Sequence, residues 1–201
     1  MIRLLLADDQ ALVRGALAAL LNLETDLDVI AEVGRGDEVL AACLAHRPDV
    51  AVLDVEMPGL DGIDATLQIK KELPGTHVLI VTTFGRPGYL RRALQSGADG
   101  FLVKDTPAKQ LADAVRRVHS GLRVVDPALA ADSLATGESP LTARETDVLR
   151  AAVNGDTVAA IAERLVLSEG TIRNHLSSAI GKTGAATRAE AARIATDNGW
   201  L

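Results

Sequence analysis

The segment VAVLDVEMPG (residues 50–59) decides the fold, because four consecutive apolar residues run directly into Asp54. An uninterrupted Val/Leu run of this kind is typical of a strand that is covered on both faces of a parallel sheet. Comparable apolar runs occupy residues 2–7, 29–33, 78–81 and 101–103. The chain therefore contains five candidate strands, and all of them lie in its first 122 residues.

Helical patterns separate these apolar runs. Val13, Leu17, Leu20 and Leu21 fall at i, i+4, i+7 and i+8, which is one apolar stripe of a helix. Strand-helix units joined by right-handed crossovers give a sheet sandwiched between helices. We predict an α/β domain over residues 1–122, with a doubly wound five-stranded parallel sheet of order 2-1-3-4-5. Its functional residues are expected at the carboxyl ends of the strands.

The pattern changes in the C-terminal third of the chain. Residues 123–138 lack a sustained apolar face, and we interpret them as a linker with room for one helical turn around residues 127–134. After Pro140 the pattern is helical throughout. The breaks fall at Gly155, near Leu167 and at Gly184. These features predict a small all-α domain of four helices over residues 139–201.

The composition limits the functional classes. Only four aromatic residues occur, so the cores must be built from Leu, Val, Ile and Ala. No apolar stretch approaches the ~20 residues of a membrane span, and the N-terminus lacks a secretory pattern. We therefore expect a cytoplasmic protein without a membrane partner. Cys43 lies among apolar residues in a helical pattern, where a buried, unreactive thiol is favoured over a nucleophile.

Polar residues stand at the ends of the predicted strands. Asp8 and Asp9 follow the first strand, Asp54 the third, Thr82 and Thr83 the fourth, and Lys104 the fifth. In a doubly wound sheet these ends converge on one edge. Three clustered carboxylates repel one another, and a hard cation such as Mg²⁺ would relieve that repulsion. The cation would also admit a phosphoryl group to Asp54, with Lys104 and the Thr82 hydroxyl as donors to its oxygens.

Each of these residues also has an ordinary structural interpretation. Acids at strand ends are often helix caps, as we predict for Asp61 before the third helix. Lys104 alone would be a surface lysine, and Thr82 alone would fill a strand. Their combination on four strand ends favours the functional interpretation.

The same residues resemble the receiver domain of two-component response regulators. The matching positions are Asp8-Asp9, Leu53-Asp54-Val55-Glu56-Met57-Pro58-Gly59, Thr82 and Lys104. The resemblance implies that a sensor histidine kinase phosphorylates Asp54, and that Thr82 and Lys104 bind the phosphate. The Mg²⁺ ligands that it implies are Asp9, Asp54 and the backbone carbonyl of Glu56, with Asp8 assisting. Phe101 holds the switch-aromatic position, where its ring would fill the space left when Thr82 moves toward the phosphate.

The segment from residue 82 to residue 89 contains two glycines and a proline beside the predicted pocket. Arg86 in this loop could contact phosphate, the kinase or a second subunit, and a solvated loop arginine is an equal alternative. Together with residues 21–24 and Gly199-Trp200, the loop is similar to a subgroup of response regulators that includes a regulator of membrane-lipid desaturation.

Residues 157–166 and 168–183 predict two helices across a tight turn, and Ser168 is a natural N-cap. The apolar stripe of the second helix consists of Ile172, Leu176, Ala179 and Ile180. Its opposite face holds Gly170, Thr171, Asn174, Ser177, Ser178 and Gly181, flanked by Arg173, His175 and Lys182. Such a face suits the major groove of DNA, where its centre approaches base edges and its flanks meet phosphates. An ordinary solvated face is the alternative, because residues 139–201 contain seven Lys/Arg and seven Asp/Glu.

This second region resembles the LuxR-type helix-turn-helix of the NarL/FixJ regulators. The matching stretches are residues 140–145, 161–165 and 167–176. The base-edge contacts that the resemblance implies come from Arg173, Asn174 and Ser177, and the contacts nearer the DNA backbone from Thr171, His175 and Lys182, with Ser178 on the same face. The partners that it implies are a double-stranded operator, a second copy of the chain after phosphorylation, and RNA polymerase.

Three departures from that family pattern predict weak binding by a single copy. Ser177 stands where a long or cationic residue is common, Gly181 costs the recognition helix about 1 kcal/mol relative to Ala, and residues 156–160 lack the usual Asn-Lys pair. Because the net charge is −6 for the whole chain, we expect a two-fold dimer on two half-sites. The alanine-rich helix at residues 188–196 is a candidate dimer surface, and packing within the domain is an equal alternative.

Two other functions would use the same residues. One is an orphan regulator whose receiver is a phosphorylation-independent interaction module, and Mg²⁺-dependent labelling by a phosphodonor would exclude it. The other is a phosphatase with Asp54 as its nucleophile. Position 56 is Glu rather than the second acid of an Asp-x-Asp motif, so we expect no enzyme beyond the receiver's own phosphotransfer and acyl-phosphate hydrolysis.

Overall fold

A computed structural model describes residues 1–83, 87–135, 139–153 and 155–201. The described residues fall into two compact units, one within residues 1–83 and 89–131 and the other within residues 87–88 and 132–201. Arg86, which the sequence suggested as a contact beside the pocket, lies outside the described residues. No helix in the described part of the chain is long and apolar enough to cross a membrane.

The first unit is built on a parallel sheet with the strand order β2-β1-β3-β4-β5-β6. The strands are β1 (Ile2–Ala7), β2 (Leu27–Val33), β3 (Val50–Leu53), β4 (His77–Thr82), β5 (Gly100–Val103) and β6 (Val124–Val125). The doubly wound order 2-1-3-4-5 is confirmed, but the strand count of five was one too low. The additional strand, β6, lies in the segment that we predicted as linker. Two residues are too short to give a strand pattern, and only their pairing with Gly100 and Phe101 reveals them.

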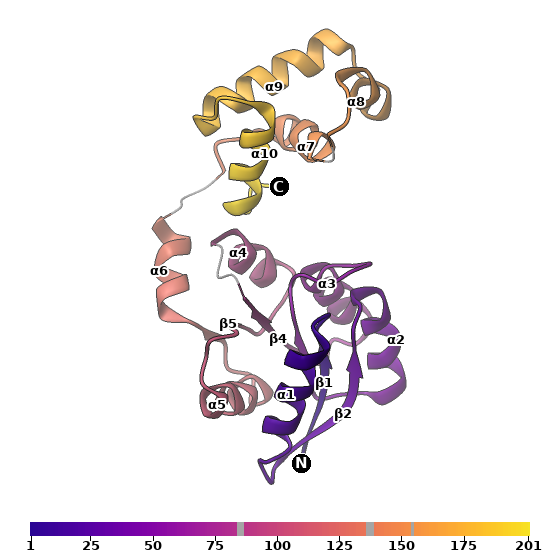
Figure 1. The fold of residues 1–201 in the computed structure, drawn as a ribbon, viewed down its shortest axis with the longest axis vertical. Coiled ribbons are helices and arrows are strands. Elements are labelled where there is room, and N and C mark those ends of the chain that lie inside the picture. Colours follow the sequence, from indigo (N-terminus) through magenta and orange to yellow (C-terminus); the bar gives the residue numbers. More distant parts are fainter. Residues whose placement is uncertain (84–86, 136–138, 154) are drawn as a thin grey trace. The chain divides into compact units, whose positions relative to one another are not determined.

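Helices cover both faces of this sheet (Figure 1). They are α1 (Ala11–Leu21), α2 (Gly36–His46), α3 (Gly62–Glu72), α4 (Pro87–Gln95) and α5 (Ala108–His119). Successive strand residues face two different apolar cores. Leu5, for example, packs with α2 and α3, whereas Leu4 packs with α1 and α5. Cys43 is fully buried in the first core, and this burial raises the pKa of its thiol to about 12. The prediction of an unreactive core cysteine is consistent with both observations.

The predicted linker is more ordered than its composition indicated. Beyond β6 it forms α6 (Pro127–Ala135), a nine-residue helix instead of one turn. The Asp126 carboxylate accepts hydrogen bonds from the amides of Ala128 and Leu129 at the start of α6, at 2.8 and 3.2 Å. Leu129 packs against the core of the first unit. The missing signal was the cap, because one Asp before a Pro does not by itself distinguish a helix start from a loop.

The second unit contains the four predicted helices, α7 (Ala143–Ala152), α8 (Val158–Leu165), α9 (Glu169–Thr183) and α10 (Arg188–Asp197). Each begins at a Ser or Thr whose hydroxyl accepts an amide hydrogen bond: Thr142, Thr157, Ser168 and Thr187. The turn between α8 and α9 places Val166 in the left-handed region at φ 55°. The alanine face of α10 lies in the core of this unit, since Ala191, Ala192 and Ala195 are buried. Packing within the domain, rather than a dimer surface, accounts for those alanines.

Candidate functional site

The predicted acidic pocket forms at the carboxyl edge of the sheet. Asp8, Asp54 and Thr82 follow or end β1, β3 and β4, and each is almost completely buried. Asp9 is exposed beside them. Carboxylate oxygens of Asp8, Asp9 and Asp54 lie within 4.8 Å of one another, a spacing from which oxygens can ligate one cation. The backbone therefore brings together acids that are more than forty positions apart in the sequence.

Lys104, just beyond β5, reaches into this cluster. Its Nζ lies 2.7 Å from Oδ2 of Asp54 and 2.7 Å from Oδ2 of Asp8. The Lys104 amide donates to the Thr82 carbonyl at 2.8 Å, which fixes the backbone from which the side chain projects. One ammonium group thus bridges the carboxylates of Asp54 and Asp8.

The electrostatics of the pocket follow from this sharing. Burial raises the pKa of the Asp54 carboxyl above its ordinary value; the hydrogen bond from Lys104 opposes the shift, and the charge of Asp8 adds to it. Burial lowers the pKa of Lys104, but its hydrogen bonds to Asp54 and Asp8 outweigh burial and leave that pKa raised. Both pKa values are raised, and the two shifts are compatible. Lys104 interacts with two carboxylates, whereas Asp54 shares the single ammonium group with Asp8. The pocket carries surplus negative charge.

The loop after β3 holds Asp54 in place through close backbone packing. The Gly62 amide donates to the Val55 carbonyl at 2.9 Å, and a Cβ at Gly62 would stand 1.9 Å from the Asp54 carbonyl oxygen. Only glycine fits there. The Asp61 side chain accepts from the Asp64 amide at 2.7 Å and caps α3, as predicted.

Phe101, in the proposed switch position, is fully buried and packs in the core beneath α3 and α4. A second aromatic residue, which the sequence did not single out, lies closer to the pocket loop. The Tyr89 hydroxyl of α4 donates to Glu56 Oε1 at 3.3 Å, so that the side chain of Glu56 connects the loop after Asp54 to α4. The only sequence signal for this contact was the presence of one Tyr in a chain with few aromatic residues.

The predicted DNA-contacting residues all lie on α9 and fall into three groups. Arg173, Asn174 and Ser177 are exposed, and Arg173 pairs with Glu169 of the preceding turn at 2.5 Å. Thr171 and His175 are half-buried, and the Thr171 hydroxyl lies 2.8 Å from that of Ser168. Ser178 and Lys182 are exposed along part of their length, but both donate to the buried carboxylate of Glu145 on α7. Sequence reasoning missed Glu145.

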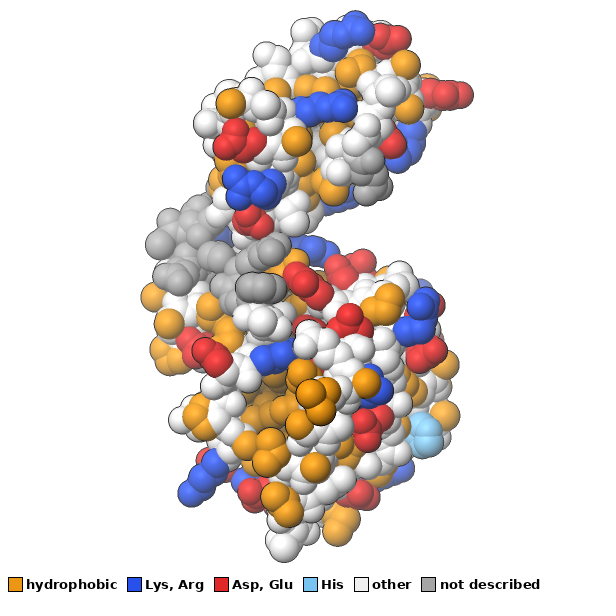
Figure 2. Space-filling model, in the orientation of Figure 1, with side chains coloured by type: hydrophobic (Ala, Val, Ile, Leu, Met, Phe, Trp, Pro, Cys, Tyr) orange, Lys and Arg blue, Asp and Glu red, His pale blue; other side chains and the backbone are white. Residues whose placement is uncertain are grey.

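The surface of the helical unit agrees with the balanced charge of residues 139–201, which contain seven Lys/Arg and seven Asp/Glu. On the face shown in Figure 2, its basic and acidic side chains are interspersed rather than gathered in one basic patch. The charge of these residues therefore provides little general attraction for a DNA backbone.

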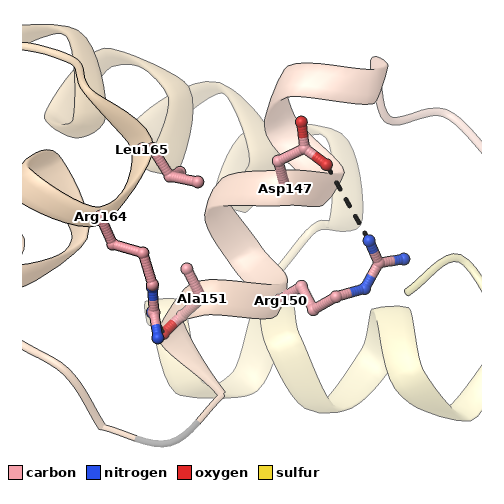
Figure 3. Close-up of a pocket in the computed structure, with 5 residues that line it drawn as sticks. All are labelled: Asp147, Arg150, Ala151, Arg164 and Leu165. Atoms are coloured by element: carbon pink, nitrogen blue, oxygen red, sulfur yellow. Dashed lines mark hydrogen bonds and ion pairs between the residues drawn. The ribbon is translucent and has the colours of Figure 1, made fainter.

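A hollow of about 380 Å³ lies between α7 and α8 and is lined by Asp147, Arg150, Ala151, Arg164 and Leu165 (Figure 3). Arg164 donates to the Ala151 carbonyl at 2.8 Å and pairs with Asp156 at 2.7 Å. These bonds fasten α8 to the C-terminal end of α7, where a cation also interacts well with the helix dipole. Arg164 at this hollow therefore has a structural role.

A phosphoacceptor-type acidic pocket on a doubly wound sheet, joined to a helix-turn-helix unit, defines the class of two-component response regulators. The comparisons agree: residues 4–116 match the response regulator receiver domain, and residues 139–195 match the LuxR family of bacterial regulatory proteins. The chain belongs to the response regulators with a LuxR-type DNA-binding domain.

Several relatives resemble this chain over its whole length. The transcriptional regulatory protein YvfU of Bacillus subtilis is 44% identical over 100% of both chains, and the transcriptional regulatory protein DesR of the same organism is 38% identical over 100% of both. The response regulator ChrA, from a heme-sensing two-component system, has a solved structure that is 32% identical, with a TM-score of 0.60 over 100% of this chain and 98% of that one. YvfU, which is described as uncharacterized, and DesR both carry the name transcriptional regulatory protein.

Proposed function

We propose that a sensor histidine kinase phosphorylates Asp54, and that phosphorylation promotes dimerisation and operator binding through α9. The observation that carries the proposal is the bridge from Lys104 to Asp54 and Asp8. In the transfer, a carboxylate oxygen of Asp54 forms the new P–O bond while the P–N bond of a phosphohistidine breaks. Acting on DNA, the protein would work in the cytoplasm of a bacterium.

The donor set fits Mg²⁺, because it consists of clustered carboxylate oxygens with an exposed side. Asp8, Asp9, Asp54 and the backbone carbonyl of Glu56 would hold the ion. When bound, Mg²⁺ would neutralise negative charge on the transferring group. Lys104 and Thr82 would then donate to the phosphoryl oxygens.

Acetyl phosphate should add one phosphoryl group to the full-length chain in the presence of Mg²⁺ and none with excess EDTA. Uptake without a divalent ion would contradict the proposal.

Lys104 should compete with the metal ion, because its ammonium group already contacts two of the carboxylates. We expect Lys104→Met to raise the affinity for Mg²⁺ roughly tenfold, since partly buried charges interact strongly at this distance. Calorimetric titration with MgCl₂ measures the change. Lys109→Met removes the same charge from an exposed position on α5 and serves as the control. Equal affinities in the two variants would contradict the competition.

The proposed switch begins in the pocket and ends on the side of α4 and β5. Thr82 would move toward the phosphate, and Phe101 would take up the vacated space. Tyr89 supports this route, because its hydrogen bond to Glu56 links α4 to the loop that follows Asp54. Phosphorylation shifts the balance between two such states only by the difference in their affinity for the phosphoryl group.

Dimerisation requires an apolar surface, and α1 carries one. Leu12 is 87% exposed and Leu20 43%, and Leu23, just beyond the helix, is 78% exposed. Hydrophobic side chains gather over α1 on the face drawn in Figure 2. Contiguous exposed apolar side chains often mark protein-protein contacts. We therefore place the proposed contact between two copies at this face.

Leu12→Glu should weaken the phosphorylated dimer at least about tenfold, since burial of a Leu side chain contributes about 1.5–3 kcal/mol. Light scattering of protein treated with acetyl phosphate measures the dimer without any kinase, and intact mass confirms equal phosphorylation. Leu67→Glu makes the same change at a 57% exposed position on α3. Unchanged dimerisation of the Leu12→Glu protein would move the interface away from α1.

A further inference from the structure

Glu145 makes an unusual set of contacts in the DNA-binding unit. It lies in the first turn of α7 and is only 4% exposed. Its Oε1 accepts a hydrogen bond from the Ser178 hydroxyl at 2.6 Å, and its Oε2 accepts from Lys182 Nζ at 2.7 Å. Oε2 also accepts from the Thr142 amide at 2.7 Å. One carboxylate thus joins the start of α7 to the C-terminal half of α9.

The charge balance of this group favours a fixed arrangement. A buried carboxylate is destabilising unless donors compensate it, and Glu145 has three. Burial raises its pKa, but the bonds from Lys182, Ser178 and the Thr142 amide outweigh burial and hold the pKa at about 2. Glu145 is therefore ionised near neutral pH. Removing Lys182 would take away the cationic partner of this buried carboxylate and leave only the Ser178 hydroxyl and the Thr142 amide as donors.

The contacts divide the recognition helix into two parts. Ser178 and Lys182 lie in the last two turns of α9, and both donate to a carboxylate inside the protein. Asn174 and Ser177 are exposed and make no side-chain hydrogen bond to the described residues. Arg173 is exposed, and its side-chain hydrogen bond to the described part of the chain stays within α9, to Glu169. Arg173, Asn174 and Ser177, around the middle of α9, are thus the side chains that are available for bases.

We propose that Glu145 is a positioning residue for DNA recognition, which holds α9 at a fixed angle and axial position through Ser178 and Lys182. Lys182 is then part of an internal ion pair and does not bind phosphate. The inference rests on the proposed contact of α9 with DNA, and it assigns the orientation of that helix to a residue of another helix. A recognition helix that is free to rotate would lose base contacts first and phosphate contacts last.

The first test compares binding to two DNA probes. Phosphorylated wild-type protein selects its preferred sequence from a random library of duplexes of about 30 base pairs, enough for two half-sites one helical turn apart. Glu145→Gln should bind the selected duplex at least about tenfold more weakly, the loss of one base-edge contact. Its affinity for an unrelated duplex should stay within about twofold. Glu163→Gln removes the same charge from an exposed position on α8 and should leave the ratio of the two affinities unchanged.

The second test uses Lys182, whose exposed side chain can be replaced with less risk to the fold. Lys182→Met should reduce the preference for the selected duplex without changing the salt dependence of binding. A lysine that contacts phosphate would instead contribute about 0.9 per protomer to the slope of log K against log salt. The double variant, with Glu145→Gln and Lys182→Met, should discriminate between the two duplexes no worse than Glu145→Gln alone. Both changes disrupt the same ion pair, so their effects should not add.

The outcomes separate the inference from the function on which it rests. A fall in the salt slope for Lys182→Met, or an unchanged affinity ratio for folded Glu145→Gln, would overturn the positioning role alone. Wild-type protein that selects no sequence would overturn the proposed DNA-reading function and the inference with it.

Discussion

Asp54→Asn protein is expected to gain no phosphoryl group from acetyl phosphate and Mg²⁺ under conditions that fully label the wild type. The amide has nearly the shape of the carboxylate but lacks the nucleophilic oxygen that would form the acyl phosphate. The fold should persist, because the change removes a buried charge close to Asp8, and Lys104 keeps Asp8 as its partner. Intact-protein mass measures the uptake, and circular dichroism confirms the fold.

Asp61→Asn is the matched control for this prediction. Asp61 follows Asp54 by seven positions and caps α3, a role that Asn also performs. This variant should be labelled like the wild type. Full labelling of the Asp54→Asn protein would show that another residue accepts the phosphoryl group. Phosphodonor-dependent dimerisation of an unlabelled Asp54→Asn protein would contradict the link between the pocket and assembly.

Local sequence patterns were sufficient to predict most of the strands around Asp54. The continuous apolar runs identified the first five strands, and the rule that parallel strands expose their carboxyl ends at one edge brought Asp8, Asp54 and Lys104 together. The sequence could not indicate how Lys104 divides its bonds, because that depends on distances between three side chains from three strands. The sharing of Lys104 is the feature that predicts competition with Mg²⁺.

The features that were missed depend on long-range contacts. β6 exists because Val124 and Val125 pair with β5, which no pattern within two residues can reveal. Glu145 completes a capping box with Thr142 at the start of α7, which is a local contact. Its bonds to Ser178 and Lys182 span 33 and 37 positions, and they change the interpretation of two residues that we had placed on the DNA face. The polar residues on one face of a helix therefore include some that bond inside the protein, so the residues that contact DNA are fewer than the face suggests.

Because residues 139–201 carry no net charge, we expect phosphorylation to have a large effect on DNA binding. With seven cations and seven anions in residues 139–201, one copy has little general attraction for the phosphate backbone. Two copies joined through their receivers would instead bind as one ligand, because the second contact becomes intramolecular. Small changes in the dimer equilibrium should then produce large changes in operator occupancy.

Arg173→Ala should cause the largest loss of sequence-specific binding among single changes on α9. A bidentate contact between an arginine and a base contributes about 1–3 kcal/mol of discrimination, and a two-fold dimer uses each contact twice. We therefore expect a loss of about 2–6 kcal/mol for the selected duplex, which is roughly thirtyfold or more. Binding to an unrelated duplex should change far less. Because Glu169 already compensates the charge of Arg173, we expect this arginine to add little non-specific attraction.

Arg193→Ala provides the matched control. Arg193 is exposed on α10 and pairs with Asp197 at i,i+4, as Arg173 pairs with Glu169, so that both variants remove one arginine from the same kind of ion pair. Titration of both duplexes at several salt concentrations separates base contacts from phosphate contacts. An equal loss for Arg193→Ala, or an Arg173→Ala defect that is the same for both duplexes, would exclude base reading by Arg173. A loss for Arg173→Ala that is confined to the selected duplex would instead mean that this domain of balanced charge recognises its sequence through Arg173, which is exposed on α9.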